Sequence, residues 1–496
     1  MFASLARHAD RYALGVIALQ VMLWTLVPAA VTLNIHLDVV EAAAWGHEWQ
    51  WGYHKGAPMS AWAAEIGALI APGQLWPIFL ISQLCIAVTF LAIWGLARRI
   101  LGPRDALVSL MITTGIYYFT FPTPEFNAII MQMPFAALAG LLLHRALTGD
   151  RLLDWAGLGA VAALGMLSRY SMAMYLVPIV GFLIVHPQAR RRLAGPGPYL
   201  AALVGLALLA PHLRWLVETD FMSFRYVDGR ATYATGWISR FLLPLHFVGA
   251  QLLALIPAVL LLFIAISAAP RRRPADGEVA AFDRQVLATL ALAPLALVIV
   301  ISVIAGRGPR SMWGGPLWCF AAPCLVAWTR SLISVEGLRR LGIGWAVLYA
   351  LPLIAYAGAN QIGPAVTGHD RRTFFPGADI ARAVEQGWAA TVGPAPLPIA
   401  VGPLWLAGNL NFYARSRPSA VIDGNYRISP WVRRADVDRR GAVLIWSVAQ
   451  DGDDLPPALA RDYPRAREQP NIVLPMQGVL RDRMVRLGWA IIPPSP

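Results

Sequence analysis

Residues 36–62 read HLDVVEAAAWGHEWQWGYHKGAPMSAW, and they lie between two long apolar runs at residues 12–33 and 75–96. The segment holds Lys55, which is the only lysine among the 41 Lys and Arg residues of the chain. An ammonium offers a compact charge with rotatable donors, which a guanidinium does not. Chance survival of one lysine is the alternative explanation. This polar segment is the point from which the rest of the chain is interpreted.

The acids and aromatic rings of the segment share one face if residues 37–50 form a helix. Asp38, Glu41, Trp45 and Trp49 follow one another at intervals of three or four residues, which makes them neighbours on a helix surface. Two carboxylates beside aromatic rings indicate a place where a polar ring stacks and a hydroxyl loses its proton. An interfacial amphipathic helix with an aromatic belt explains the same spacing equally well.

Glycine and proline predict a turn at the end of this helix. The break comes at Gly52 and at residues 56–58, which read GAP. We expect the turn to bring three polar side chains back toward the acids, those of Tyr53, His54 and Lys55.

The composition is that of a polytopic membrane protein. The 496 residues are 57% hydrophobic and only 14% charged, with a mean hydropathy of +0.55. The net charge of +13 comes largely from arginines in alternate loops, as the positive-inside rule predicts, so we expect no nucleic-acid partner. The three cysteines lie inside apolar runs and form no disulfide or metal-binding pattern.

Eleven apolar runs are predicted to be membrane-spanning helices, although some are shorter than the roughly 20 residues that a span requires. They are residues 12–33, 75–96, 106–121, 128–143, 153–167, 171–185, 199–215, 241–269, 286–305, 317–328 and 341–357. This count places every arginine-dense connector on one side of the membrane. It predicts a multi-pass membrane protein with a cytoplasmic N-terminus and a first outer loop at residues 34–63. We expect the membrane to be the bacterial inner membrane.

The composition changes at residue 361, where charged residues become frequent. Strand-like and helix-like stretches alternate after this point, which predicts a small α/β domain. The strand-like stretches are residues 398–402, 420–423, 442–448 and 490–493, and the helix-like ones are residues 377–390 and 404–413. The predicted organisation is an α-helical transmembrane module at residues 1–360 and a periplasmic α/β domain at residues 361–496.

The available side chains suit transfer of a group from a phosphate-bearing donor. Cations stabilise charge on a leaving phosphate, and a positioned carboxylate takes the proton of the acceptor. A donor whose phosphate lies at the membrane surface would be linked to a lipid. In this hypothesis Asp38 is the base, and Glu41 orients the acceptor or helps to hold a divalent cation. Lys55, Arg307 and Arg310 contact the phosphate.

Ordinary structural roles compete with these assignments. Acids favour the first turn of any helix, and the two arginines of the third outer loop suit a surface loop. Arg169, at the tip of the hairpin between the fifth and sixth runs, is expected to snorkel rather than to bind phosphate. Glu125 and Asn127 are expected to cap the next helix. Three histidines lack metal-ligand spacing and are expected to be structural: His36, His47 and His54.

The first loop resembles that of the GT-C glycosyltransferases of glycosyltransferase family 39, which are related to protein O-mannosyltransferases and to aminoarabinose transferases of lipid A. The matching residues are Asp38, Glu41, Gly52, Tyr53, Lys55, Pro58 and Trp62. Asn127, the sequence RSMWGGP at residues 310–316 and the sequence WLAGNLNFYARSRPS at residues 405–419 are also similar. The resemblance is most specific in the first loop.

The resemblance implies a polytopic fold with its active site on the outer face, a polyprenyl-phosphate sugar donor and inversion of the anomeric centre. The catalytic acid of the family maps onto Asp38, and the lysine for the donor phosphate maps onto Lys55. Many relatives have adjacent Asp and Glu, whereas Val39 and Val40 separate the acids here, which leaves the role of Glu41 open. The expected substrate-binding residues are Trp45, Tyr53, His54, Lys55, Arg307, Arg310 and Trp313.

The leading hypothesis is an integral-membrane glycosyltransferase that moves a sugar from a polyprenyl phosphate to an extracytoplasmic acceptor. That acceptor would be lipid A or its core, another lipid-linked glycan, or a protein. The only cofactor expected is a divalent cation, which Asp38 and Glu41 would bind. A lipid or glycan transporter is the first alternative, although transporters carry their charges near the midplane on broken helices. The second is a non-catalytic envelope scaffold that binds its partners through the tail.

Overall fold

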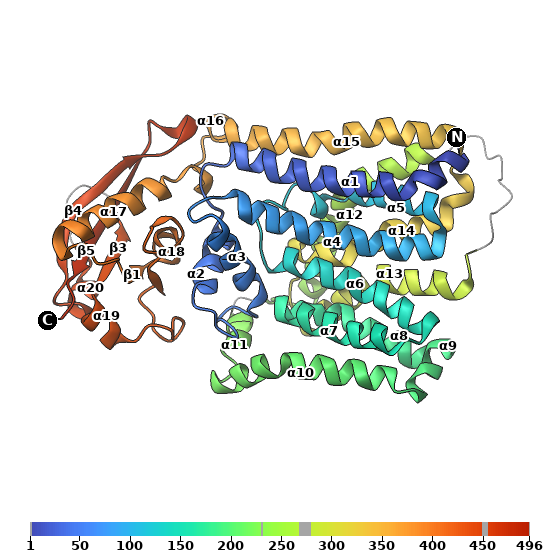
Figure 1. The fold of residues 1–496 in the computed structure, drawn as a ribbon, viewed down its shortest axis with the longest axis horizontal. Helices are drawn as coiled ribbons and strands as arrows, with labels where there is room; N and C mark the ends of the chain where they lie inside the picture. The colour runs from blue at the N-terminus through green and yellow to red at the C-terminus, as the bar shows by residue number, and fades with distance from the viewer. Residues whose placement is uncertain (1, 230–231, 267–278, 449–454, 496) are drawn as a thin grey trace.

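The computed structural model describes residues 2–229, 232–266, 279–448 and 455–495. Figure 1 shows a bundle of long helices lying side by side, with a mixed α/β unit at one end. The N-terminus lies at the opposite end of the bundle from this unit. The fold is thus a mostly helical membrane architecture with a small C-terminal sheet.

Seven described helices are long and apolar enough to cross a membrane, or up to eight if a pair bent by 84° at residues 170–194 counts as one span. The seven are α1 (Phe2–Val31), α4 (Trp76–Leu101), α6 (Ala128–Gly149), α10 (Gly197–Glu218), α12 (Trp237–Ala265), α13 (Ala281–Ala305) and α15 (Val335–Gln361). The other four predicted runs contain the shorter helices α5 (Pro103–Thr114), α7 (Leu152–Ser168), α8 (Ala173–Val185) and α14 (Ala321–Thr329). Each predicted run therefore holds a helix, and the count of eleven spans stays a prediction.

Irregular structure shortens two of these helices. α5 ends at Thr114 and passes into the 3-10 helix η1 (Tyr117–Phe119), and α14 follows the 3-10 helix η4 (Ser311–Trp318). The remaining 3-10 helices are η2 (Tyr170–Met172), η3 (Arg191–Ala194), η5 (Arg330–Leu332), η6 (Arg372–Phe374) and η7 (Gly478–Leu480). The remaining short helices are α2 (Leu37–Gly46), α3 (Met59–Ile70), α9 (Pro187–Arg190), α11 (Met222–Gly229) and α16 (Gly363–Thr367).

Amide side chains buried inside the bundle bond to one another. Gln20 donates through Nε2 to Gln83 Oε1 at 3.0 Å and to the carbonyl of Phe119 at 2.9 Å. The hydroxyl of Tyr349 donates to Gln20 Oε1 at 2.7 Å, and Gln83 donates to Thr123 at 2.9 Å. Because the hydrocarbon core of a bilayer offers no water, polar groups there need such partners. This network ties α1, α4 and α15 to the turn that follows η1.

The C-terminal sheet has five strands in the order β2-β1-β3-β5-β4. Its strands are β1 (Ile399–Gly402), β2 (Ser419–Ile422), β3 (Ala442–Ser447), β4 (Arg467–Pro475) and β5 (Met484–Ile492). β2, β1 and β3 run parallel, with Val401 opposite Val421, whereas β5 is antiparallel to both β3 and β4. The four predicted strands correspond to β1, β2, β3 and β5, and the fifth strand, β4, was not predicted.

Helices cover both faces of the sheet, which explains the continuous apolar runs of its parallel strands. On one face lie α17 (Gly377–Val392) and α18 (Leu404–Tyr413), packed on a cluster that includes Ala400 and Val443. On the other face, α19 (Arg434–Arg440) and α20 (Pro457–Asp462) adjoin a cluster that includes Leu444. The division of the chain at residues 360 and 361 stays a prediction. α18 packs directly on α2 of the first loop.

Candidate active site

α2 carries the acids of the first loop, and it is shorter than the predicted helix at residues 37–50. It ends at Gly46, where a Cβ would lie 2.0 Å from the carbonyl oxygen of Ala61 in α3. The chain then turns, and Trp49 has a φ of 46° with a side chain that is 49% exposed. The expectation that Trp49 shares a face with the acids is therefore wrong, because the helix ends before this residue.

The predicted return of the chain toward α2 is confirmed. Tyr53 and Gly56 form a two-way backbone pair, with N–H donors 2.9 and 3.0 Å from the partner carbonyls. This turn carries Lys55 back to α2, where its Nζ donates to Glu41 Oε1. The Tyr53 ring stacks on Trp45, with centroids 5.2 Å apart and planes 6° apart. The only lysine of the chain is thus paired with the second acid of the loop.

Aromatic rings enclose the Lys55 ammonium. Its Nζ lies 5.9 Å from the centroid of the Trp45 ring and 5.5 Å from that of Tyr226 in α11, distances at which a ring face attracts a cation. His54 meets the same two rings edge-on, and its side chain is buried. Desolvation and the charge of Lys55 lower the pKa of His54 to about 4. At neutral pH the positive charge here therefore belongs to Lys55 and not to His54.

Asp38 lies one helical turn before Glu41 and differs from it in having no partner. No hydrogen bond or ion pair reaches its half-buried carboxylate from the described residues. Burial raises the pKa of Asp38, and the nearby charge of Glu125 raises it further. The charges of Lys55 and Arg169 oppose this rise. Asp38 is thus an unpaired carboxylate with cations close by and a raised pKa, as a general base requires.

Arg169 belongs to this cluster and does not extend into solvent as a snorkelling side chain would. It follows α7 in an extended conformation and is half-buried. Its guanidinium lies over the ring of Trp313, 5.7 Å from the ring centroid. Arg310, at the start of η4, is exposed and close enough for its charge to act on Arg169. The structure therefore brings Arg310 and Trp313 to the neighbourhood of Asp38 through Arg169.

Arg307 contacts the segment before α12, and its expected contact with a donor phosphate stays a prediction. Its guanidinium lies 5.1 Å from the centroid of the Tyr233 ring, and Nη2 donates to the Tyr233 hydroxyl at 3.1 Å. The carbonyl of Arg307 also accepts a hydrogen bond from Ser302 at 2.7 Å. Its described contacts thus hold the loop after α13 and do not include Asp38.

Glu125 is the functional candidate that sequence reasoning placed only at a helix start. The predicted cap is provided by Asn127, whose side chain accepts from the N–H groups of Ile129 and Ile130 at 2.9 and 3.3 Å. Glu125 is exposed in the loop before α6, yet desolvation raises its pKa and the charge of Arg372 opposes this rise. Arg372 lies over the ring of Trp405, so the C-terminal segment also brings a cation near the cluster.

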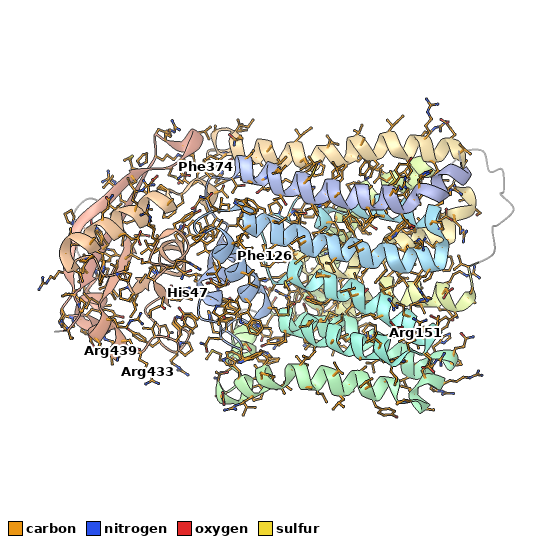
Figure 2. The ribbon with its side chains drawn as sticks, viewed as in Figure 1. His47, Phe126, Arg151, Phe374, Arg433 and Arg439 are labelled. Carbon is orange, nitrogen blue, oxygen red and sulfur yellow. The ribbon has the colours of Figure 1, made fainter. Side chains whose placement is uncertain are left out.

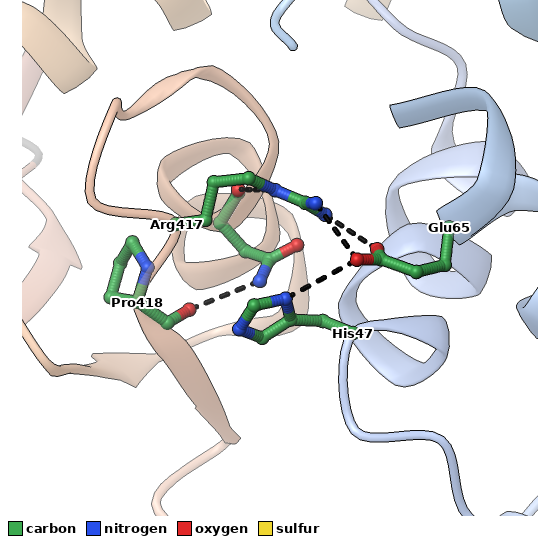
Figure 3. Close-up of polar contacts among 5 residues, drawn as sticks. His47, Glu65, Arg417 and Pro418 are labelled. Atoms are coloured by element: carbon green, nitrogen blue, oxygen red, sulfur yellow. Dashed lines mark hydrogen bonds and ion pairs between the residues drawn. The ribbon is translucent and has the colours of Figure 1, made fainter. Parts of the chain in front are cut away.

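A buried ion pair fixes the first loop to the C-terminal segment. Arg417 donates through both terminal nitrogens to Glu65, at 2.8 and 2.5 Å, and Nδ1 of His47 lies 3.5 Å from the same carboxylate (Figure 3). Glu65 is 2% exposed and Arg417 9% exposed. Burial alone would raise the pKa of Glu65, but the hydrogen bonds from His47 and Arg417 outweigh burial and lower it. The carboxylate is therefore held ionised.

Arg417 lies in the segment at residues 405–419 that carries the resemblance noted above, and this segment makes further bonds to the start of the first loop. Asn34 donates to Asn409 Oδ1 at 3.3 Å, and the backbone N–H of Ile35 donates to the Tyr413 hydroxyl at 3.0 Å. These bonds fix the chain just ahead of α2. The role of the segment in the structure is to position the first loop, and Figure 2 shows His47 at this junction.

A metal site is not evident among the described residues, because no group of three or more His, Cys, Asp or Glu side chains is arranged to hold an ion. Glu41, one of the two proposed ligands, is paired with Lys55. The divalent cation stays an untested expectation.

Three known proteins or families show what the chain is similar to. The family model for dolichyl-phosphate-mannose-protein mannosyltransferases matches residues 55–215. The lipopolysaccharide core galacturonosyltransferase RgtA of Rhizobium johnstonii is 26% identical over 418 residues, which cover 79% of this chain and 78% of RgtA. The crystal structure of ArnT from Cupriavidus metallidurans bound to undecaprenyl phosphate aligns with a TM-score of 0.62 and 13% identity, over 98% of this chain and 99% of ArnT. The apo structure of ArnT aligns equally well.

These findings support an enzyme rather than a transporter or a scaffold. The likeness to ArnT shows the fold, and the matches to RgtA and to the mannosyltransferase model indicate a glycosyltransferase. In its fold and over most of its sequence, the chain is therefore similar to multi-pass membrane glycosyltransferases of the GT-C superfamily.

Proposed function

We propose that this enzyme transfers one sugar from a polyprenyl phosphate to an acceptor hydroxyl on the outer face of the bacterial inner membrane, with Asp38 as the general base. The observation that carries the proposal is the unpaired Asp38 carboxylate, which lies close enough to Lys55 and Arg169 for both charges to lower its pKa. A base for the acceptor and cations for the leaving phosphate thereby meet at one end of the bundle. The undecaprenyl phosphate bound to ArnT, which shares this fold, supports a polyprenyl carrier.

The proposed reaction is a single displacement. Asp38 takes the proton of the acceptor hydroxyl while the acceptor oxygen forms a bond to the anomeric carbon of the sugar. The bond from that carbon to the phosphate oxygen breaks on the opposite face, so the configuration inverts and polyprenyl phosphate leaves. Lys55 and Arg310 stabilise the charge on the departing phosphate, because fixed cations are most effective where charge develops.

Other residues of the cluster position these groups. Glu41 holds the Lys55 ammonium through its ion pair, and the rings of Trp45 and Tyr226 limit its movement. We assign Glu41 this role in place of acceptor binding. Arg169, stacked on Trp313, keeps positive charge close to Asp38 and so opposes the rise in the pKa of this carboxyl.

The sugar and acceptor are proposed from the relative of known activity. RgtA is a galacturonosyltransferase of the lipopolysaccharide core, so an acidic sugar and a lipid-linked core glycan form the first pair to test. The cations beside Asp38 suit a donor that carries a sugar carboxylate as well as a phosphate. The arginines at the opposite end of the bundle favour a cytoplasmic location for that end, and this supports a periplasmic location for the site and the C-terminal sheet.

The experiment is a transfer assay with the purified full-length enzyme in nanodiscs. Synthetic polyprenyl-phosphate galacturonic acid and the neutral galactose analogue are offered with a lipopolysaccharide core acceptor, and products are identified by mass spectrometry. The proposal predicts transfer that depends on the polyprenyl phosphate and a product of inverted configuration by NMR. Transfer from a nucleotide sugar alone, or retention of configuration, would contradict it.

A further inference from the structure

A second charged site lies at the end of the bundle that is opposite the sheet. There a cavity of about 150 Å³ is lined by Arg99, Arg145, Gly149, Arg151 and Asp154. Figure 2 shows Arg151 at this end, far from His47 and the sheet. The lining residues come from α4, α6 and α7 and from the connection between the last two helices. The cavity is therefore remote from the cluster around Asp38.

The cavity keeps an excess of positive charge. Its one acid, Asp154, is 4% exposed and accepts from Arg145 at 2.8 Å. Arg99 donates to the hydroxyl of Thr148 at 3.4 Å. Arg151, in the connection before α7, is exposed. Within the described parts of the chain, neither Arg99 nor Arg151 has an acid within 4.0 Å. Three arginines and one aspartate leave a net charge of +2 around the cavity.

Neighbouring arginines outside the cavity are paired with acids, unlike Arg99 and Arg151. Arg98, adjacent to Arg99, donates to both carboxylate oxygens of Asp10 at 2.8 and 3.0 Å. Arg192 pairs with Asp150, the residue before Arg151, at 2.5 Å. The nearby acids are thus taken by arginines outside the cavity. The guanidinium groups of Arg99 and Arg151 remain available to an anion.

The cavity also adjoins a surface that suits lipid chains. Leu152 and Leu153, the first two residues of α7, are 50% and 81% exposed. They directly follow Arg151, so apolar side chains and a guanidinium stand next to each other at the end of an apolar helix. A phospholipid offers the same juxtaposition of acyl chain and phosphate, and basic pockets between helices at a membrane surface recognise anionic headgroups.

We propose that Arg99, Arg145 and Arg151 form a binding site for a phosphate group, with Asp154 holding Arg145 in place. Guanidinium groups bind phosphate oxygens through paired N–H donors, which a lysine cannot reproduce. The phosphate comes from an anionic phospholipid of the surrounding leaflet or from a soluble phosphate. In either case the bound anion joins the ends of α4, α6 and α7. This site does not depend on the function proposed for Asp38.

The test uses the full-length protein in phosphatidylcholine nanodiscs. One arm titrates phosphatidylglycerol and the other titrates inorganic phosphate, and each follows bound ligand by native mass spectrometry and the midpoint of thermal unfolding. The variants are Arg151→Gln and the double variant Arg99→Gln with Arg151→Gln. Arg190→Gln is the matched control, because Arg190 is an exposed arginine at the same end that does not line the cavity.

Binding should weaken by about fivefold for Arg151→Gln and by about 25-fold for the double variant, and Arg190→Gln should leave it unchanged. This result with phosphatidylglycerol identifies a lipid headgroup site, and the same result with inorganic phosphate identifies a soluble ligand. Equal binding of both ligands by the double variant and the unmodified protein would overturn the proposal. So would an equal loss in Arg190→Gln, because the effect would then be one of surface charge alone.

Discussion

Replacement of Arg417 by methionine is expected to loosen the contact between the first loop and the C-terminal segment. The change leaves the Glu65 carboxylate at 2% exposure without its two strongest donors. Removal of one partner of a buried ion pair costs about 3–5 kcal/mol. His47, 3.5 Å from the same carboxylate, remains and keeps the cost toward the lower limit.

The expected effect is large enough to measure by hydrogen exchange. Each 1.36 kcal/mol changes an equilibrium tenfold, so local opening should increase by roughly a hundredfold to a thousandfold. Peptides that cover residues 404–422 should therefore exchange much faster in Arg417→Met, followed by mass spectrometry of the nanodisc-embedded protein. The double variant with Glu65→Leu should recover much of the protection, because no unpaired buried charge then remains.

Arg382→Met provides the matched control, because Arg382 pairs with Asp379 on the exposed surface of α17, with side chains 66% and 44% exposed. Exposed pairs contribute little, so exchange in this variant should not change. If Arg417→Met accelerated exchange no more than Arg382→Met, the ion pair would not hold the first loop, and the role assigned to the C-terminal segment would be wrong.

Three further predictions concern the cluster itself. Lys55→Ala should raise the KM for the donor by roughly tenfold or more, since a charge-assisted hydrogen bond is lost, and an unchanged donor KM would exclude the phosphate contact. Acid should inactivate the enzyme as the pH falls through the raised pKa of Asp38. Glu125→Gln removes a charge that raises this pKa, so the acidic limb of the kcat/KM profile should move to lower pH. An acidic limb that does not move would count against the influence of Glu125 on Asp38. Trp313→Ala should free Arg169 and slow transfer by about two- to thirtyfold, whereas Trp313→Phe keeps a ring face and most of the rate in the same assay.

Local patterns predicted the helices and the return of the first loop because both depend on short-range chemistry. Every apolar run became a helix, and the turn at Tyr53 and Gly56 followed from glycine and proline near the end of α2. The prediction for Trp49 was wrong because the spacing of three and four residues continues past Gly46 in the sequence, whereas the helix ends at this glycine.

Arg169 and Glu125 could not be placed from the sequence, because the fold alone brings them to Asp38. They lie 131 and 87 residues from Asp38 along the chain, and neither belongs to a motif. β4 was not predicted because of its composition. Its sequence, REQPNIVLP, is charged and contains prolines, which an edge strand tolerates because one of its sides needs no partner.

The central claim is that Asp38 is the base, and one measurement tests it most directly. Asp38→Asn keeps the shape of the side chain but cannot accept the proton. We expect it to slow transfer by about 100-fold to 10,000-fold in the nanodisc assay, while donor binding by native mass spectrometry is retained. Asp10→Asn, at the opposite end of the bundle, is the control and should keep its full rate. Full activity of Asp38→Asn with donor and acceptor would contradict the account.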